Sequence, residues 1–382
     1  MLRRFAVFLL IFQTTLFLLH FFLFKTLLAA FAFLGSSVYW LVAGALAFLA
    51  FSFVSTSLLA FRSRAAIVRF LYIPAAVWLG LFNYLFLASI AWWLVAAIIF
   101  VFHFSFSATI PAVLLFGAAL TTGIYGLVNA AIPRVKHVTI SLQNLPPVWH
   151  GRSFALVSDL HLGHVHKRRF AARIVNLIRA ENPHFAVIAG DLFDGTAIDA
   201  EHATAPFRGL VLPFGTFFSE GNHEEFRDPR SLLSAITRAG IRILDKKIVD
   251  LDGLQLLGVT YRDATHPEHF RSVLAGMEID TTRASILICH SPDRPAVTEE
   301  AGVSLQVSGH THGGQFFPHT WFATRIYRQF VHGLSRIGNL QVYTSYGVGT
   351  WGPPLRVGTF PELVIIHLQK SDSGIQLAAL SI

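Results

Sequence analysis

Acidic residues are missing from the first two fifths of this 382-residue chain, where no Asp or Glu precedes Asp159. Nine of the 30 Lys and Arg lie before that point, so the other 21 stand against all 22 acids and give the remainder a net charge of −1. Charged residues make up only 14% of the chain and hydrophobic residues 53%, which excludes an ordinary soluble protein. Because the excess of basic residues borders apolar runs, the net charge of +8 does not indicate a nucleic-acid partner, and none is expected.

Cysteine is nearly absent as well. Cys289 is the single cysteine, so an intrachain disulfide is excluded, and a reducing compartment is compatible with the sequence. Cys289 lies inside an apolar run, where a small buried residue is a better interpretation than a nucleophile.

Four long apolar runs fill the part that lacks acids, at 5–24, 38–61, 70–102 and 108–132. Each is long enough to cross a hydrocarbon core of about 30 Å as a helix. The third is longer than one crossing needs, so it is either one tilted helix or includes a re-entrant piece. A cleaved signal peptide is the alternative for the first run, but the runs that follow favour a retained helix. We predict a transmembrane domain of about four helices over 1–133, in which His20 lies at a membrane interface.

The basic residues of this domain predict its orientation. Arg3 and Arg4 precede the first run, while Arg62, Arg64 and Arg69 separate the second from the third, and Arg134 and Lys136 follow the fourth. The two other connections hold no Lys or Arg, although Lys25 falls near their side. Basic residues in short loops favour the cytoplasm. An integral protein of the cell membrane, with both termini and the polar part in the cytoplasm, is therefore predicted.

The composition changes beyond the fourth run. Residues 134–153 are interpreted as a polar connector with a short alternating strand. From 154 to 382, short apolar runs alternate with helical patterns, which predicts an α/β domain. Helices are expected at 167–179 and 231–239. Strands are expected at 154–158, 184–189, 216–218, 255–259, 286–289, 305–307, 341–344 and 363–368.

Residues of metal-ligand type directly follow five of these strands. Side chains two apart in an extended segment point the same way, so His310 and His312 can face one common point. The carboxyl ends of strands are also where open α/β sheets assemble sites from separate loops. The five motifs are Asp159-Leu160-His161, Gly190-Asp191 with Asp194, Gly221-Asn222-His223-Glu224, His290, and Gly309-His310-Thr311-His312. Each alone is a weak signal, but their succession predicts one shared site.

The ligand types indicate two divalent metal ions. Asp and Asn oxygens mixed with imidazoles suit Mn, Fe or Zn rather than Ca or a thiolate site. One carboxylate can bridge two ions about 3.5–4 Å apart, and such a pair clamps the oxygens of a phosphoryl transfer and supplies hydroxide at neutral pH.

Over about residues 150–370, this ordered set of motifs resembles the calcineurin-like metallophosphoesterase superfamily. The resemblance implies a two-sheet β-sandwich flanked by helices, in a metal-dependent phosphoric ester hydrolase. The stretch 343–354 resembles the membrane-bound or exported branch, whose exported members favour the opposite side of the membrane from the basic residues. In protein serine/threonine phosphatases an Arg follows the second Asp of the Gly-Asp motif, and Gly195 stands here instead, which argues against protein phosphatase activity.

The resemblance also implies a role for each motif residue. His223 matches the acid histidine, and Asp194 matches its orienting partner. Independently of the resemblance, His164 and His166 follow the first motif and either meet the substrate or lie in a surface loop. The implied ligands are Asp159, His161 and His312 for one ion, and Asn222, His290 and His310 for the other, with Asp191 bridging both.

Three functions remain open. The favoured one is a membrane-anchored phosphoesterase that hydrolyses phosphate esters of small molecules or lipids by metal-activated hydroxide. The alternative is a pyrophosphohydrolase acting on a nucleotide-linked or phospholipid substrate, suggested by the anchor and by similarity to the UDP-diacylglucosamine hydrolases. A non-catalytic binding scaffold is disfavoured because such a protein would be expected to have lost ligands, and none is missing here.

Overall fold

The computed structural model describes residues 2–32, 35–105, 107–226 and 229–371. The chain divides into two compact units. The helical unit consists of Met1–Ala131 together with Trp351–Val357, and the α/β unit contains Ile132–Thr350 and the chain from Gly358 onward. Residues 372–382 of the predicted domain 154–382 lie outside the described residues.

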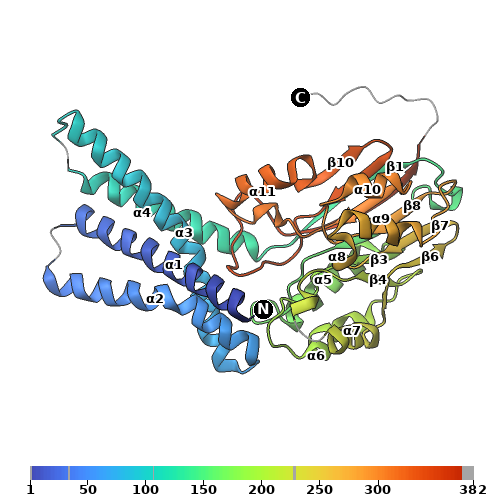
Figure 1. The fold of residues 1–382 in the computed structure, drawn as a ribbon, viewed down its shortest axis with the longest axis horizontal. Coiled ribbons are helices and arrows are strands. Elements are labelled where there is room, and N and C mark those ends of the chain that lie inside the picture. Colours follow the sequence, from blue (N-terminus) through green and yellow to red (C-terminus); the bar gives the residue numbers. More distant parts are fainter. Residues whose placement is uncertain (1, 33–34, 106, 227–228, 372–382) are drawn as a thin grey trace. The chain divides into compact units, whose positions relative to one another are not determined.

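The helical unit contains four long helices, labelled in Figure 1: α1 (Leu2–Ala30), α2 (Ser36–Arg62), α3 (Ala66–Val101) and α4 (Thr109–Ala130). By length and composition, all four could cross a membrane, so the described residues contain as many candidate spans as the predicted number of about four. The third apolar run forms one continuous helix of 36 residues despite Pro74. At 1.5 Å per residue it is about 54 Å long, so it is a single overlong helix rather than a helix with a re-entrant piece.

Polar side chains join these helices to one another. Trp78 Nε1 donates to His20 Nε2 at 3.0 Å, and Trp93 Nε1 donates to Thr26 Oγ1 at 3.0 Å. The position of His20 at a membrane interface stays a prediction; within the helical unit its ring is buried and stacks on Phe82 with centroids 3.8 Å apart. In an apolar setting such a histidine is retained where a neighbouring helix supplies its partner, as Trp78 does here.

The segment Trp351–Val357 packs among these helices. Asn129 Nδ2 donates to the carbonyl of Arg356 at 3.0 Å, and the N–H of Arg356 donates to the carbonyl of Gly126 at 3.0 Å. A Cβ at Gly126 would lie 2.7 Å from Val357 Cγ2, so glycine provides the room for this approach. From the sequence, residues 351–357 were predicted to belong to the domain 154–382. In the structure this segment instead leaves the α/β unit and packs with the helical unit, an excursion that the sequence did not indicate.

The α/β unit is built on two six-stranded mixed sheets, in agreement with the predicted fold class. The first has the order β1 (Arg134–Leu142), β12 (Glu362–Lys370), β2 (Ser153–Val157), β3 (Phe185–Ala189), β4 (Thr216–Ser219) and β5 (Ile241–Ile243). The second has the order β10 (Gly333–Ile337), β11 (Leu340–Thr344), β9 (Leu305–Ser308), β8 (Ser285–Ile288), β7 (Leu254–Gly258) and β6 (Lys247–Leu251). β1 arises from the stretch interpreted as a connector and is an edge strand parallel to β12.

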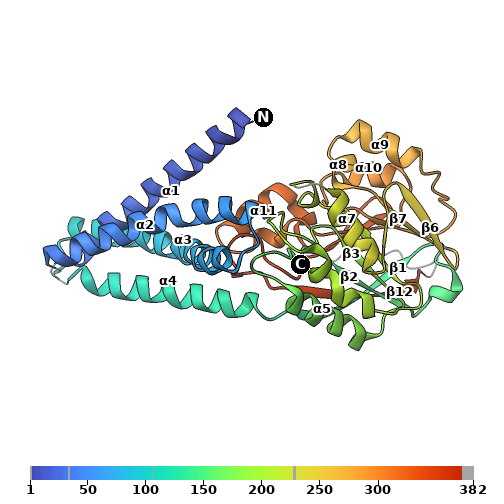
Figure 2. The same cartoon turned by 90° about the horizontal axis from the view of Figure 1, so that it is seen from below.

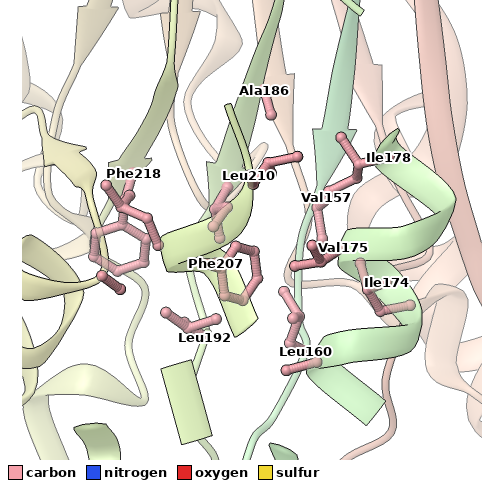
Figure 3. Packing of buried hydrophobic residues seen from close by; sticks show 14 of the residues in the cluster. Val157, Leu160, Ile174, Val175, Ile178, Ala186, Leu192, Phe207, Leu210 and Phe218 are labelled. Carbon is pink, nitrogen blue, oxygen red and sulfur yellow. The ribbon is translucent and has the colours of Figure 1, made fainter. Parts of the chain in front are cut away.

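Helices cover the outer face of each sheet (Figures 1 and 2). Against the first lie α5 (Arg168–Glu181), α6 (Ala200–Thr204) and α7 (Pro229–Arg238). Figure 3 shows part of this core, with Ile174, Val175 and Ile178 of α5. Against the second lie α8 (Tyr261–Ala264), α9 (Pro267–Ala275) and α10 (Pro295–Glu300). The remaining helix is α11 (His319–Tyr327), and short 3-10 turns occupy Pro147–Trp149, Ala205–Gly209, Glu224–Phe226, His312–Gly314 and Arg328–Val331.

The strands are apolar on both faces because each sheet lies between two cores. In β2, Phe154 and Leu156 belong to the core between the sheets, whereas Ala155 and Val157 pack toward the helices. Parallel strands buried in this way lose the alternation of polar and apolar residues. The parallel pairing of β2, β3 and β4, and that of β7, β8 and β9, brings their carboxyl ends to the same edge of each sheet.

Candidate metal centre

The structure brings the seven predicted metal ligands together at these carboxyl ends. Asp159, Asp191 and Asn222 follow β2, β3 and β4 of the first sheet, and the four histidines come from loops of both sheets. Three groups have ligand atoms within 4.8 Å of one another: Asp159, His161 and His312; His161, Asp191 and His223; and Asp191, His290 and His310. The sheet edge therefore gathers residues that are up to 153 positions apart in the chain, Asp159 and His312.

The first ligand group contains Asp159, His161 and His312. Nε2 of His161 lies 3.0 Å from Nε2 of His312, and the latter lies 3.5 Å from Oδ1 of Asp159. His161 and Asp159 are buried, so bulk water does not separate these atoms. Two imidazole nitrogens and a carboxylate oxygen directed at one point fit a divalent cation of the Mn, Fe or Zn type.

The second ligand group contains Asn222, His290 and His310. Nε2 of His290 lies 3.1 Å from Asn222 Oδ1 and 3.2 Å from His310 Nδ1. On its other side, His290 Nδ1 lies 2.8 Å from the carbonyl oxygen of Ala189, to which it donates. That contact leaves Nε2 as the atom that faces the other ligands, which is the usual arrangement for a metal-bound imidazole.

The expectation that His310 and His312 face one common point is wrong. His312 lies with the first group and His310 with the second. Their φ angles are +48° and +70°, so neither residue is extended and the spacing rule for strands does not apply to them. The resemblance, which assigns them to different ions, matches this arrangement better than the spacing argument does.

Asp191 lies between the two groups. Its Oδ2 is 3.8 Å from His161 Nε2 and 3.3 Å from His290 Nε2. Burial acts to raise the pKa of Asp191, but His290, His223 and His161 outweigh it and hold the pKa well below its usual range. Burial likewise opposes the charged form of His290, yet Asp191 raises the pKa of that imidazole to about 10. An ionised carboxylate that draws a proton onto a buried histidine marks a place where a metal cation can replace that proton.

Backbone strain is concentrated in these ligands. Non-glycine residues with positive φ are uncommon, and they persist where the surrounding structure imposes them, often at functional sites. Five of the seven candidate ligands have positive φ: Asp159 (54°), His161 (48°), Asp191 (51°), His310 (70°) and His312 (48°). Gly190, at φ 81°, could not be replaced, because a Cβ there would collide with the ring of His290.

His223 faces the same site and contacts Asp194, the predicted partner, through the main chain of that residue. Its Nδ1 lies 3.0 Å from the main-chain carbonyl oxygen of Asp194, to which it donates. The Asp194 carboxylate instead accepts from the N–H of Thr196 at 2.7 Å and from its hydroxyl at 2.6 Å. Burial raises the pKa of Asp194 to about 6. The contact of Asp194 with His223 is thus made by the carbonyl, while Thr196 takes up the carboxylate.

Glu224 supports the site in a way that the sequence did not indicate. It is fully buried and accepts from the N–H groups of Asp191 (3.0 Å), Phe193 (3.1 Å) and Gly221 (2.8 Å). A single carboxylate therefore ties the loop after β3 to the loop after β4. Its place directly after Asn222 and His223 was the only signal in the sequence.

Two tyrosines border the second group and were also missed. The ring of Tyr261 lies 5.5 Å from that of His310, and the ring of Tyr327 lies 6.2 Å from it. Tyr261 directly follows the loop after β7, so its place at a strand end could have identified it, whereas Tyr327 belongs to α11 and carried no signal in the sequence.

His164 is buried and His166 pairs with Thr350 Oγ1 at 3.0 Å, so neither matches an exposed surface loop. Cys289 is buried, and its burial raises the pKa of the thiol to about 12, in line with a structural role.

Known proteins are similar to this chain in sequence. Residues 152–314 match the family model of the calcineurin-like phosphoesterases. An uncharacterized metallophosphoesterase of Campylobacter jejuni is 31% identical over 252 residues, which cover 64% of this chain and 66% of that protein. A transmembrane protein with metallophosphoesterase domain from Danio rerio is 31% identical over 283 residues, which cover 70% of this chain and 64% of that protein. The chain thus spans about two thirds of the length of these two relatives.

Proposed function

Because this chain belongs to the calcineurin-like phosphoesterases, we propose that it is a membrane-anchored hydrolase of phosphate esters that works with two divalent cations. The observation that carries the proposal is the position of Asp191, whose Oδ2 lies within 3.8 Å of His161 Nε2 and 3.3 Å of His290 Nε2. A shared carboxylate between two nitrogen-rich groups suits two ions held side by side.

Each residue then has a defined task. When bound, the ions supply Lewis-acid polarisation of a phosphoryl oxygen and an ionised water at neutral pH. Asp191 stays ionised and belongs to both ligand groups, while Glu224 fixes the two loops that carry Asp191 and Asn222. His223 turns Nε2 toward the site and holds a proton for the leaving oxygen. The ligands would be Asp159, His161 and His312 for one ion, and Asn222, His290 and His310 for the other.

The purified full-length protein provides the direct test. We expect metal analysis to find two divalent ions per chain, and hydrolysis to cease after chelation and to return with Mn, Fe or Zn. One ion or none would contradict the dinuclear site, and a fully loaded protein without hydrolysis would favour a binding scaffold.

Assays on monoesters, diesters and lipid pyrophosphates separate ester hydrolysis from the alternative function. That alternative is pyrophosphate cleavage in a nucleotide-linked or phospholipid substrate, and the four apolar helices favour a lipid-linked substrate.

We further propose that the α/β unit lies in the cytoplasm. Arg62, Arg64 and Arg69 stand at the junction of α2 and α3, and Arg134 follows α4, so basic residues border one set of helix ends. Lys25, on the opposite side, is exposed in α1 and five residues from its end, where its long side chain can reach the headgroups.

Reporter fusions measure this orientation. A green fluorescent protein fused after Ile382 should be fluorescent, and an alkaline phosphatase fused at the same point should be inactive. Active phosphatase with a dark fluorescent protein would place the α/β unit outside, as in the exported members of the family. Fusions in the α1–α2 connection should give the reverse pattern and serve as the matched control.

A further inference from the structure

Helix α11 lies beside the candidate metal centre. Its inward face carries Ala323, which is buried, and Tyr327, whose ring lies 6.2 Å from that of His310. At its start, a Cβ on Gly314 would collide with the carbonyl of His319, so the helix packs directly on the loop that carries His310 and His312. The position of α11 is therefore coupled to the ligand loop.

The outward face of α11 is unusually apolar. Trp321 is 50% exposed, Phe322 is 51% exposed and Ile326 is 70% exposed, and Phe317, just before the helix, is 51% exposed. Trp321 and Phe322 are packed edge to face with their rings 4.9 Å apart. A surface helix of a soluble domain normally turns such residues inward. Helix α5 does so, since its exposed positions include Arg169, Arg173 and Asn176.

Basic residues accompany this apolar face. The guanidinium of Arg325 lies 5.0 Å from the centre of the Trp321 ring, and Arg328 follows the helix directly. Between Glu300 and Glu362 the chain contains no Asp or Glu, so no acidic residue of this stretch offsets the two arginines. Aromatic and aliphatic side chains beside arginine, on one side of a helix, are the composition of helices that lie in the interface of an anionic membrane.

We propose that α11 and Phe317 form a membrane-docking surface, whose partner is the headgroup region of an anionic phospholipid bilayer. Trp321, Phe322 and Ile326 enter the boundary between headgroups and acyl chains, while Arg325 and Arg328 contact lipid phosphates. Because α1–α4 hold the chain in a membrane, the effective concentration of this partner is high, and a small apolar face is sufficient. The ligand loop next to α11 is thereby held close to the lipid surface.

Depth-dependent quenching tests this surface in the full-length protein. In a Phe322→Cys variant, the new cysteine is labelled with an environment-sensitive fluorophore. The labelled protein is placed in nanodiscs of phosphatidylcholine and phosphatidylglycerol, in which some lipids carry a nitroxide quencher on a shallow acyl carbon. An Arg173→Cys variant, labelled on the exposed face of α5, is the matched control. The native Cys289 is buried and is therefore not expected to react with the fluorophore. We expect quenching of the α11 probe to exceed that of the α5 probe by about twofold or more and to weaken when only phosphatidylcholine is present. Equal quenching of the two probes would overturn the proposal.

A second variant separates insertion from mere proximity. Trp321→Ser with Ile326→Ser, in the Phe322→Cys background, should lower quenching to the level of the α5 probe without lowering Tm, since both side chains are exposed. Unchanged quenching would mean that the apolar face does not enter the lipid and would overturn the proposal. Full burial of the probe from water without lipid quenching would indicate a protein partner instead and would overturn it as well. Since neither readout uses hydrolysis, failure of the proposed activity leaves this test intact.

Discussion

The Asp191→Asn variant is expected to lose hydrolysis by about 1,000-fold or more, because loss of even one electrostatic stabiliser of a transition state costs about 10²–10³. The substitution keeps the shape of the side chain but removes the negative charge that lies 3.3 Å from His290 Nε2 and 3.8 Å from His161 Nε2. Without that charge, both ligand groups have one anionic ligand fewer. We therefore expect metal content to fall from two ions per chain to one or none.

The fold should survive this change. The N–H of His223 donates to Oδ1 of Asp191 at 2.9 Å, and the oxygen of an asparagine amide can accept the same hydrogen bond. Asp252→Asn is the matched control, since Asp252 is exposed and its φ of +49° is one that asparagine tolerates. The control should keep both ions and hydrolyse nitrophenyl phosphate at the rate of the unchanged protein. Two retained ions with activity within tenfold of that rate would refute a bridging Asp191.

The location of this candidate site could be predicted from the sequence because most of its proposed ligands follow buried strands. The apolar runs before Asp159 and Asp191 are β2 and β3, which are parallel neighbours in the first sheet and end at the same edge. His290 follows β8 of the second sheet, so its approach to the other two depends on how the two sheets pack. The same reasoning failed for His310 and His312, because it assumed extended backbone where the chain adopts left-handed φ. The resemblance to the family had assigned these two histidines to different ions, which is compatible with the two groups that their side chains join.

What remained hidden depends on contacts between distant parts of the chain. Nothing in the residues around Asp194 indicates that its carbonyl, rather than its carboxylate, would hold His223, since Thr196 takes up the carboxylate. Tyr327 reaches His310 only because α11 packs on the ligand loop. The excursion of 351–357 into the helical unit was equally inaccessible, because it depends on the space left by Gly80 and Gly126 in helices more than 200 residues earlier.

The His223→Ala variant is expected to slow hydrolysis of alkyl phosphate esters by about 10²–10⁴-fold, the usual contribution of a general acid. Nδ1 of His223 is occupied by the carbonyl of Asp194, so Nε2, 3.8 Å from Asp191 Oδ2, is the nitrogen that faces the ligand groups. An alkoxide leaves only with a proton, whereas nitrophenolate leaves without one. Nitrophenyl phosphate hydrolysis should therefore fall by about tenfold or less, with metal content unchanged.

Two further variants make this result specific. His202→Ala removes an exposed histidine and should leave both activities intact. Asp194→Asn alters the side chain but keeps the carbonyl that orients His223, so its alkyl-ester activity should remain well above that of His223→Ala. If both ester types slow equally in His223→Ala, the histidine holds substrate rather than donating a proton. If Asp194→Asn is as damaged as His223→Ala on alkyl esters alone, the carboxylate of Asp194, and not its carbonyl, orients His223.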